Sequence, residues 1–158
     1  MPNWCENTLG VNGEPGKLRA FRKSVKGVAP ESGEEVLLDE NKLIPYPEKF
    51  RKMDAEAHQW DKEHPNDRAG RGPDGFNSGG YEWCIANWGT KWGFQDVEVI
   101  HENEGSVTYF FLTAWSPPLP LIRKAGELFP NLDFHLEYNE SDGGIFGKLD
   151  ILKGEVSH

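Results

Sequence analysis

Alternation of apolar and polar side chains is clearest in the second half of the chain, where it predicts a β-hairpin. Residues 97–102 (VEVIHE) and 106–115 (SVTYFFLTAW) are strand-like runs separated by a turn that ends at Gly105. The second run has apolar side chains at both odd and even positions. Because this pattern is typical of a strand covered on both faces, we expect a central strand there.

Three further stretches have the pattern of strands. Residues 4–12 alternate loosely and are predicted to form the first strand. Residues 132–138 (LDFHLEY) alternate regularly, as a strand with one buried and one solvated face does. A turn over residues 142–144 allows residues 145–152 (IFGKLDIL) to return beside them.

Two segments have the spacing of amphipathic helices. Residues 15–26 place apolar side chains at helical intervals, begin with a proline suited to the first helical position, and precede Gly27 as a cap. A second helix is expected from a cap at Ser116 to Phe129, where Pro130 ends it.

A long polar insertion separates the first helix from the hairpin. Residues 28–45 contain an apolar run closed by prolines, which predicts a strand and an extended segment. Residues 47–64 have helical character, and residues 69–80 are rich in glycine and proline, which predicts an exposed, mobile loop. A short helix capped by Ser78 and ending at Gly89 follows. Its core face is expected to carry Tyr81, Cys84, Ile85 and Trp88.

This order of elements predicts an α+β protein with a ferredoxin-like fold. Without the insertion, at approximately residues 28–93, the order is βαββαβ, which places both helices on one face of an antiparallel sheet. Residues 145–152 add an extra C-terminal strand. We interpret residues 1–158 as one domain, because a chain of this length can bury a single stable core.

Charge and cysteine content narrow the class of protein. The formal net charge is −9, which disfavours a large nucleic-acid surface because phosphates are held mainly by Lys and Arg. No stretch approaches the roughly 20 apolar residues of a membrane span, so we expect a soluble protein of the bacterial cytoplasm. Cys5 and Cys84 are too few for a disulfide framework and are interpreted as buried free thiols.

Five short motifs indicate a family. Together they resemble the YubB-type ferredoxin-like proteins, which are small uncharacterised proteins of phages and plasmids. The resemblance implies a ferredoxin-like fold and an origin in a mobile element, and it spans most of the chain outside residues 50–78. The motifs are MPNWCENTL (1–9), NKLIPYP (41–47), NWGTKW (87–92), TAWSPPLP (113–120) and GGIFG (143–147).

The NWGTKW motif is the strongest candidate binding site. It contains two tryptophans four positions apart with a lysine between them, and a cation over indole rings gains roughly 0.5 to 2 kcal/mol. Two further tryptophans are expected near the same end of the sheet. The alternative is that these rings only pin the insertion onto the core. The candidate residues are Trp4, Asn87, Trp88, Lys91, Trp92 and Trp115.

A second candidate is a metal site in the insertion. Asp54, His58, Asp61 and His64 recur at intervals of about one helical turn, and carboxylates and imidazoles are ligands for zinc and similar ions. The spacing matches no established metal motif, and an exposed charged helix face is the alternative.

The sequence has no G-x-S-x-G motif, phosphate-binding loop or dinucleotide fingerprint. We therefore expect a non-enzymatic accessory protein without a cofactor, which binds a host- or element-encoded protein and has an undetermined oligomeric state. Two alternatives stay open: a metal-dependent enzyme using the Asp/His residues of the insertion, and single-stranded nucleic-acid binding on the open face of the sheet.

Overall fold

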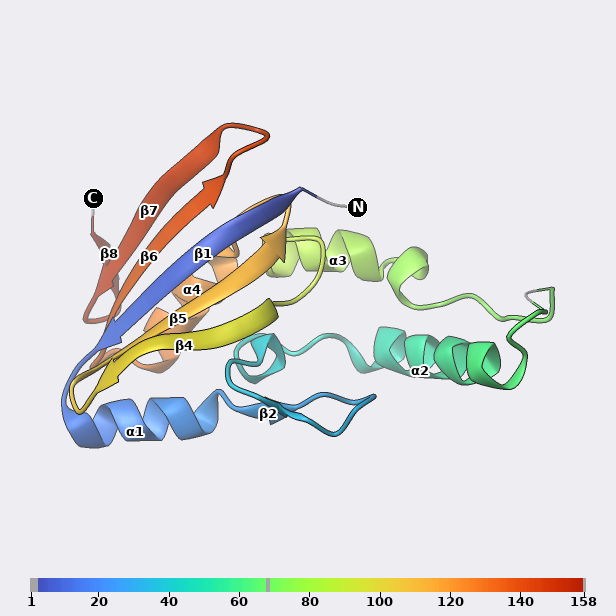
Figure 1. The fold of residues 1–158 in the computed structure, drawn as a ribbon, viewed down its shortest axis with the longest axis horizontal. Coiled ribbons are helices and arrows are strands. Elements are labelled where there is room, and N and C mark those ends of the chain that lie inside the picture. Colours follow the sequence, from blue (N-terminus) through green and yellow to red (C-terminus); the bar gives the residue numbers. More distant parts are fainter. Residues whose placement is uncertain (1–2, 68, 158) are drawn as a thin grey trace.

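The computed structural model describes residues 3–67 and 69–157, and its centre is a six-stranded sheet in the order β4-β5-β1-β6-β7-β8 (Figure 1). Every neighbouring pair of these strands is antiparallel. The first strand thus lies between two strands from the second half of the chain. The strands are β1 (Trp4–Asn12), β4 (Gln95–Asn103), β5 (Ser106–Ala114), β6 (Asp133–Glu140), β7 (Ile145–Leu152) and β8 (Glu155–Ser157).

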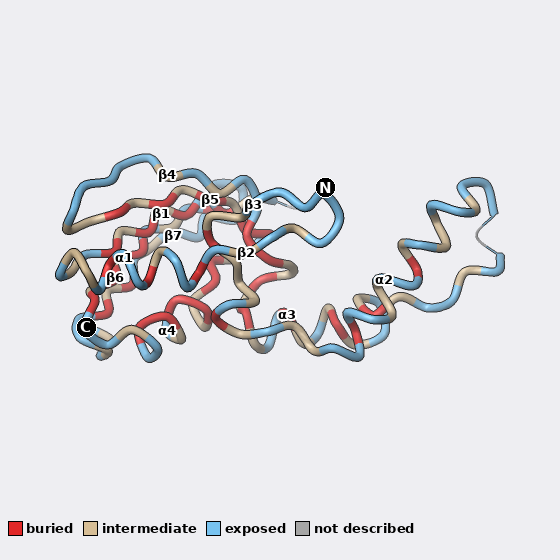
Figure 2. The backbone as a smooth tube through the Cα atoms, turned by 90° about the horizontal axis from the view of Figure 1, so that it is seen from below, coloured by how far each residue is buried: buried red, intermediate tan, exposed pale blue. Residues whose placement is uncertain are grey.

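Two helices, α1 (Pro15–Ser24) and α4 (Leu119–Leu128), cover one face of this sheet (Figures 1 and 2). The order β1-α1-β4-β5-α4-β6 confirms the predicted ferredoxin-like fold, including the long insertion and the extra strand β7. The short strand β8 was not predicted. No helix of residues 3–67 and 69–157 lies over the other face of the sheet (Figures 1 and 2).

The core lies between the sheet and these helices. Phe21 of α1 is fully buried and makes edge-to-face ring contacts with Tyr109, Phe129 and Phe134. Gly126 of α4 lies so close to Ile151 that a β-carbon there would meet its side chain at 2.7 Å. The glycine therefore lets the helix approach β7 closely.

The insertion extends away from the sheet as an arm, which Figure 2 shows most clearly. The helix expected over residues 47–64 is α2 (Glu48–Glu63), and α3 (Gly80–Asn87) follows. The strand and extended segment predicted over residues 28–45 are largely replaced by short elements and a turn. The structure has there only β2 (Gly27–Val28), β3 (Glu35–Val36) and the 3-10 turn η1 (Glu40–Lys42); η2 (Phe76–Ser78) lies before α3.

Several predicted helix ends also differ. Gly79, rather than Ser78, precedes α3 and no side chain caps that helix, while Ile85 is exposed instead of facing the core. Ser116 does not cap α4, because its hydroxyl donates to the Gly89 carbonyl oxygen. Val25 caps α1, and Gly27 belongs to β2. Within residues 3–67 and 69–157, no helix is long and apolar enough to cross a membrane.

Candidate functional site

The candidate site lies where β1 begins and β5 ends, and two loops build it. Gly89 ends α3 with a φ of 80°, and a β-carbon there would meet Pro120 at 2.5 Å, so only glycine fits. The buried Thr90 donates its hydroxyl to the Ala114 carbonyl oxygen at 2.9 Å. Together with the bond from Ser116 to Gly89, this contact fixes the NWGTKW segment against the end of β5.

Trp115 has a rare backbone conformation. Its φ is 71°, in the left-handed region that costs a bulky residue roughly 1 to 3 kcal/mol. Its amide donates to the Asn3 carbonyl oxygen at 2.8 Å, which helps to hold it there. The indole remains 41% exposed. Backbone strain of this kind concentrates at functional sites.

Three aromatic rings surround the ammonium group of Lys91, and we call this group the Lys91 cage. The Lys91 Nζ lies 4.4 Å from the ring centre of Trp115, 4.9 Å from that of Trp92 and 5.9 Å from that of Tyr81. All three distances are within the range of cation–π attraction. The Tyr81 and Trp115 rings meet edge to face at 6.4 Å.

Two more rings extend the Lys91 cage. Trp4 of β1 packs against Trp92, with ring centres 6.2 Å apart. Phe76 of η2 contacts both Trp92 and Tyr81, at 6.4 and 5.7 Å. The cage therefore joins the first strand, the insertion and the end of β5.

Lys91 forms no ion pair in the described part of the chain. None of the ion pairs among residues 3–67 and 69–157 includes Lys91. The contacts that the structure shows for its cation are with the negative faces of the rings, which attract it less strongly than a carboxylate does at close range. An anionic group from another molecule would complete this arrangement.

The structure brings four of the six predicted residues together, namely those that the Lys91 cage and its extension contain. Trp88 instead enters the core, where it is 4% exposed and its indole N–H donates to the Ile44 carbonyl oxygen at 2.8 Å. Its ring packs against Trp83 and Tyr46. Asn87 donates to the Trp83 carbonyl oxygen within α3. The four that come together are Trp4, Lys91, Trp92 and Trp115.

Sequence reasoning missed Tyr81 and Phe76. Tyr81 was expected to face the core from a helix, and Phe76 lay in a segment expected to be an exposed loop. That segment is held in place, because the Phe76 amide donates to the Asp54 carboxylate at 3.0 Å and Gly75 packs against the backbone of Phe50. A signal was present in Phe76, which interrupts the Gly-rich run, and in Tyr81, which follows it.

The four candidate metal ligands each contact a different partner. Asp54 accepts from the Tyr46 hydroxyl at 2.9 Å as well as from Phe76, and Asp61 pairs with Arg71 at 3.1 Å. His58 lies 3.6 Å from Glu31, and His64 stacks on Trp60. Among the described residues, no three His, Cys, Asp or Glu side chains are grouped to hold a metal ion.

A hollow of about 1010 Å³ lies between the β2–β3 hairpin and η1. Glu40 lines it, and its pKa is raised to about 7, chiefly by burial and further by the neighbouring Asp39. The backbone amides of Glu40 itself and of Phe94 oppose this shift of the pKa. Glu40 thereby links η1 to the segment that follows the NWGTKW motif.

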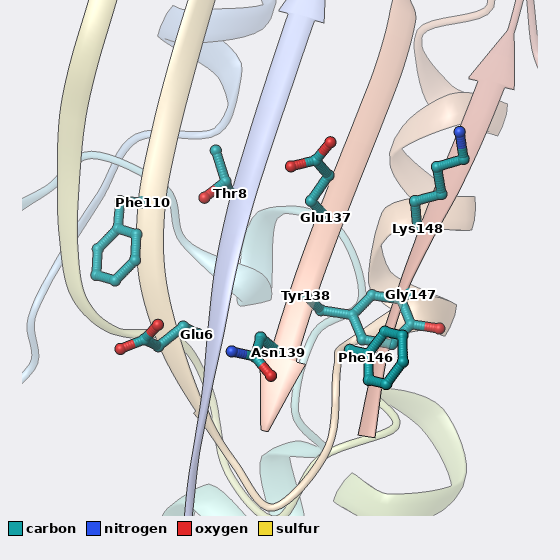
Figure 3. A pocket seen from close by; sticks show the side chains of 9 residues that line it. All are labelled: Glu6, Thr8, Phe110, Glu137, Tyr138, Asn139, Phe146, Gly147 and Lys148. Carbon is teal, nitrogen blue, oxygen red and sulfur yellow. The ribbon is translucent and has the colours of Figure 1, made fainter. Parts of the chain in front are cut away.

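A shallow trough of about 410 Å³ lies on the open face of the sheet (Figure 3). Phe110 of β5 and Phe146 of β7 stand at its two sides, and Glu6 and Glu137 lie between them. Of the aromatic side chains of β5, only Phe110 is on this face, because Tyr109 and Phe111 are buried in the core. Carboxylates in this position repel phosphate, which counts against nucleic-acid binding here.

Comparison with known proteins agrees with this fold. The crystal structure of protein Api92 from Yersinia pseudotuberculosis is similar, with a TM-score of 0.62 and 12% identity over 99% of this chain and 96% of that chain. At this identity the likeness concerns the fold alone. Among curated proteins, none matches the chain in sequence. Residues 87–158 match the family model described as the ferredoxin-like domain in Api92-like protein, and this part of the chain is therefore similar to that domain.

Proposed function

We propose that this chain is a non-enzymatic protein-binding module of a phage or plasmid, and that its partner docks on the Lys91 cage. The observation that carries the proposal is the Lys91 ammonium, which lies 4.4 Å from the centre of the half-exposed Trp115 ring and forms no ion pair among the described residues. Tryptophan and tyrosine dominate the energetics of protein interfaces, because large rigid rings bury much area at a small entropy cost. The mobile-element origin is supported by the motifs that resemble YubB-type proteins.

The chemistry of the Lys91 cage favours one kind of partner segment. A carboxylate can form a charge-assisted bond with Lys91, while an adjacent apolar side chain packs against Trp115 and Tyr81. The partner is then a host- or element-encoded protein that presents an acidic residue beside an apolar one. We place this interaction in the cytoplasm of the bacterial host.

Selection from a library of random peptides displayed on phage tests this function directly. The immobilised protein is expected to enrich peptides that carry Asp or Glu next to an apolar residue, and Lys91→Gln should abolish the enrichment. Lys49→Gln is the matched control, because the Lys49 ammonium also lies over an aromatic ring, 4.8 Å from the centre of Phe50, outside the cage. Peptides that bind Lys91→Gln as well as they bind the wild type would contradict the proposal.

A further inference from the structure

The trough on the open face of the sheet is lined by two carboxylates, whereas the Lys91 cage holds a cation. Its lining forms two rows across the strands. Glu6 stands opposite Leu112 on one side and Asn139 on the other, and Asn139 stands opposite Phe146. The second row consists of Phe110, Thr8, Glu137 and Lys148 in the same register.

The two carboxylates of the trough, Glu6 and Glu137, take part in no ion pair of the described structure. Glu137 and Lys148 face each other across neighbouring strands, yet no ion pair of the described residues includes Glu6, Glu137 or Lys148. Glu6 and Glu137 are both exposed. The trough therefore presents two negatively charged carboxylates that can accept hydrogen bonds, and Lys148 is the one cation of its lining.

The aromatic ring at one side of the trough is also left uncovered by the rest of the protein. Phe146 is 78% exposed, although burying a large aromatic side chain stabilises a protein by roughly 1.5 to 3 kcal/mol. Phe110 and Phe146 are separated by three strand spacings of about 4.8 Å and by two residues along the strands, so they bracket roughly 16 Å. An extended segment of about five residues covers that distance.

We propose that this trough is a second docking site, which takes an arginine-containing segment of a protein partner. Charge complementarity selects a cation, because Glu6 and Glu137 lie between the rings and Lys148 is the one basic side chain of the lining. Arginine fits better than lysine because its planar guanidinium stacks on Phe110 or Phe146 while it donates to both oxygens of a carboxylate. Apolar side chains on either side of the arginine then cover the exposed ring of Phe146.

The trough continues toward the Lys91 cage. Trp4 and Glu6 are two residues apart on β1 and lie on the same face, about 7 Å from one another along the strand. One partner can therefore contact both sites, with its acidic group at Lys91 and its arginine at Glu6. The proposal for the trough goes beyond the proposed function and holds whether or not the cage binds its own segment.

The test is a titration of the ¹⁵N-labelled full chain with a capped hexapeptide of alternating arginine and leucine, followed by NMR. We expect saturable shifts of amides in β1, β6 and β7 around Glu6, Glu137 and Gly147. The double variant Glu6→Gln/Glu137→Gln should weaken binding by about tenfold or more, since each charge-assisted bond is lost. The matched control Glu34→Gln/Glu104→Gln removes two exposed charges elsewhere and should bind as the wild type does.

Other outcomes separate the alternatives. Lys91→Gln should leave the peptide titration unchanged, so failure of the proposed cage function and failure of this inference are distinguishable. Equal weakening by both double variants would reduce the effect to general charge attraction and overturn the proposal. Shifts at the same amides on addition of oligothymidylate would also overturn the proposal, because this face would then bind nucleic acid. A dimer in sedimentation analysis that the double variant Glu6→Gln/Glu137→Gln dissociates would overturn it as well, because this face would then bind a second copy of the chain.

Discussion

The carboxyl group of Glu40 lies directly against Gly93, so closely that a β-carbon at residue 93 would overlap one of the carboxyl oxygens. Two motifs far apart in the sequence are joined at this point, because Glu40 begins η1 and Gly93 follows NWGTKW. Partial burial, and further the charge of the neighbouring Asp39, raise the pKa of the Glu40 carboxyl group to about 7. The contact therefore couples the packing of the insertion to pH.

Glu40 should make the stability of the protein fall as pH rises. The folded chain keeps the proton up to about pH 7, whereas the ordinary pKa is 4.5, so stability is lost between these values as pH increases. Glu40→Gln removes this titration and should stabilise the protein above pH 8 by up to about 3 kcal/mol, since one pKa unit corresponds to about 1.4 kcal/mol. Urea unfolding at pH 5 and pH 8 measures both effects, with the exposed Glu34→Gln as control. An unchanged pH slope in Glu40→Gln would contradict the burial of this carboxyl group.

Trp88 and Lys91 should separate stability from binding. Trp88→Ala leaves a cavity and an unpaired Ile44 carbonyl oxygen, so it should cost roughly 3 to 5 kcal/mol or prevent soluble expression. Lys91→Ala removes only contacts with rings and should cost less than about 1 kcal/mol. Thermal unfolding of both variants provides the comparison. A Trp88→Ala protein as stable as the wild type would show that the ring does not hold the insertion.

Replacement of Trp115 should reveal the strain in its backbone. Glycine adopts a φ of 71° without penalty, whereas alanine keeps the strain and loses the ring. Trp115→Gly is therefore expected to be more stable than Trp115→Ala by about 1 kcal/mol, even though glycine usually destabilises a folded chain. Denaturant midpoints of the two variants decide the question, and the reverse order would argue against a left-handed residue 115.

The cysteines should react slowly with thiol reagents in the folded protein. Cys84 is buried and its pKa is raised to about 12, first by burial and then by the carboxylates of Glu40 and Asp54. At pH 8 only about one thiol in ten thousand is then ionised, and the thiolate is the reactive form. Burial raises the pKa of Cys5 as well. Reaction with a chromogenic disulfide reagent should be slow in buffer and fast in urea, and a Cys5–Cys84 disulfide in protein purified without reductant would refute this prediction.

The ferredoxin-like arrangement was predictable because its strands and the helices α1 and α4 have strong periodic patterns. The pattern of residues 28–45 led to a wrong prediction. Leu38 and Leu43 are buried as in a strand, but the Asp39 side chain accepts a hydrogen bond from the Asn41 amide and turns the chain into η1. Local hydrogen bonding of this type competes with an extended backbone.

The candidate site was only partly predictable for a geometric reason. Trp88 and Trp92 are four positions apart, which suggests one helical face, but Gly89 ends the helix between them and the two rings enter different clusters. Tyr81 and Phe76 join the cage through the path of the insertion, which depends on tertiary contacts such as that between Asp54 and the Phe76 amide. A path that depends on tertiary contacts leaves no periodic pattern in the local sequence.

The central place of β1 also determines the order in which the protein can be completed during synthesis. The two strands that pair with it, β5 and β6, lie in the second half of the chain. At about 5 to 20 residues per second, the ribosome makes them on the order of ten seconds after β1. Until then the apolar positions Leu9 and Val11 have no sheet to join. The central sheet can therefore be completed only after residue 140 has emerged, and until then β1 is exposed to non-native pairing.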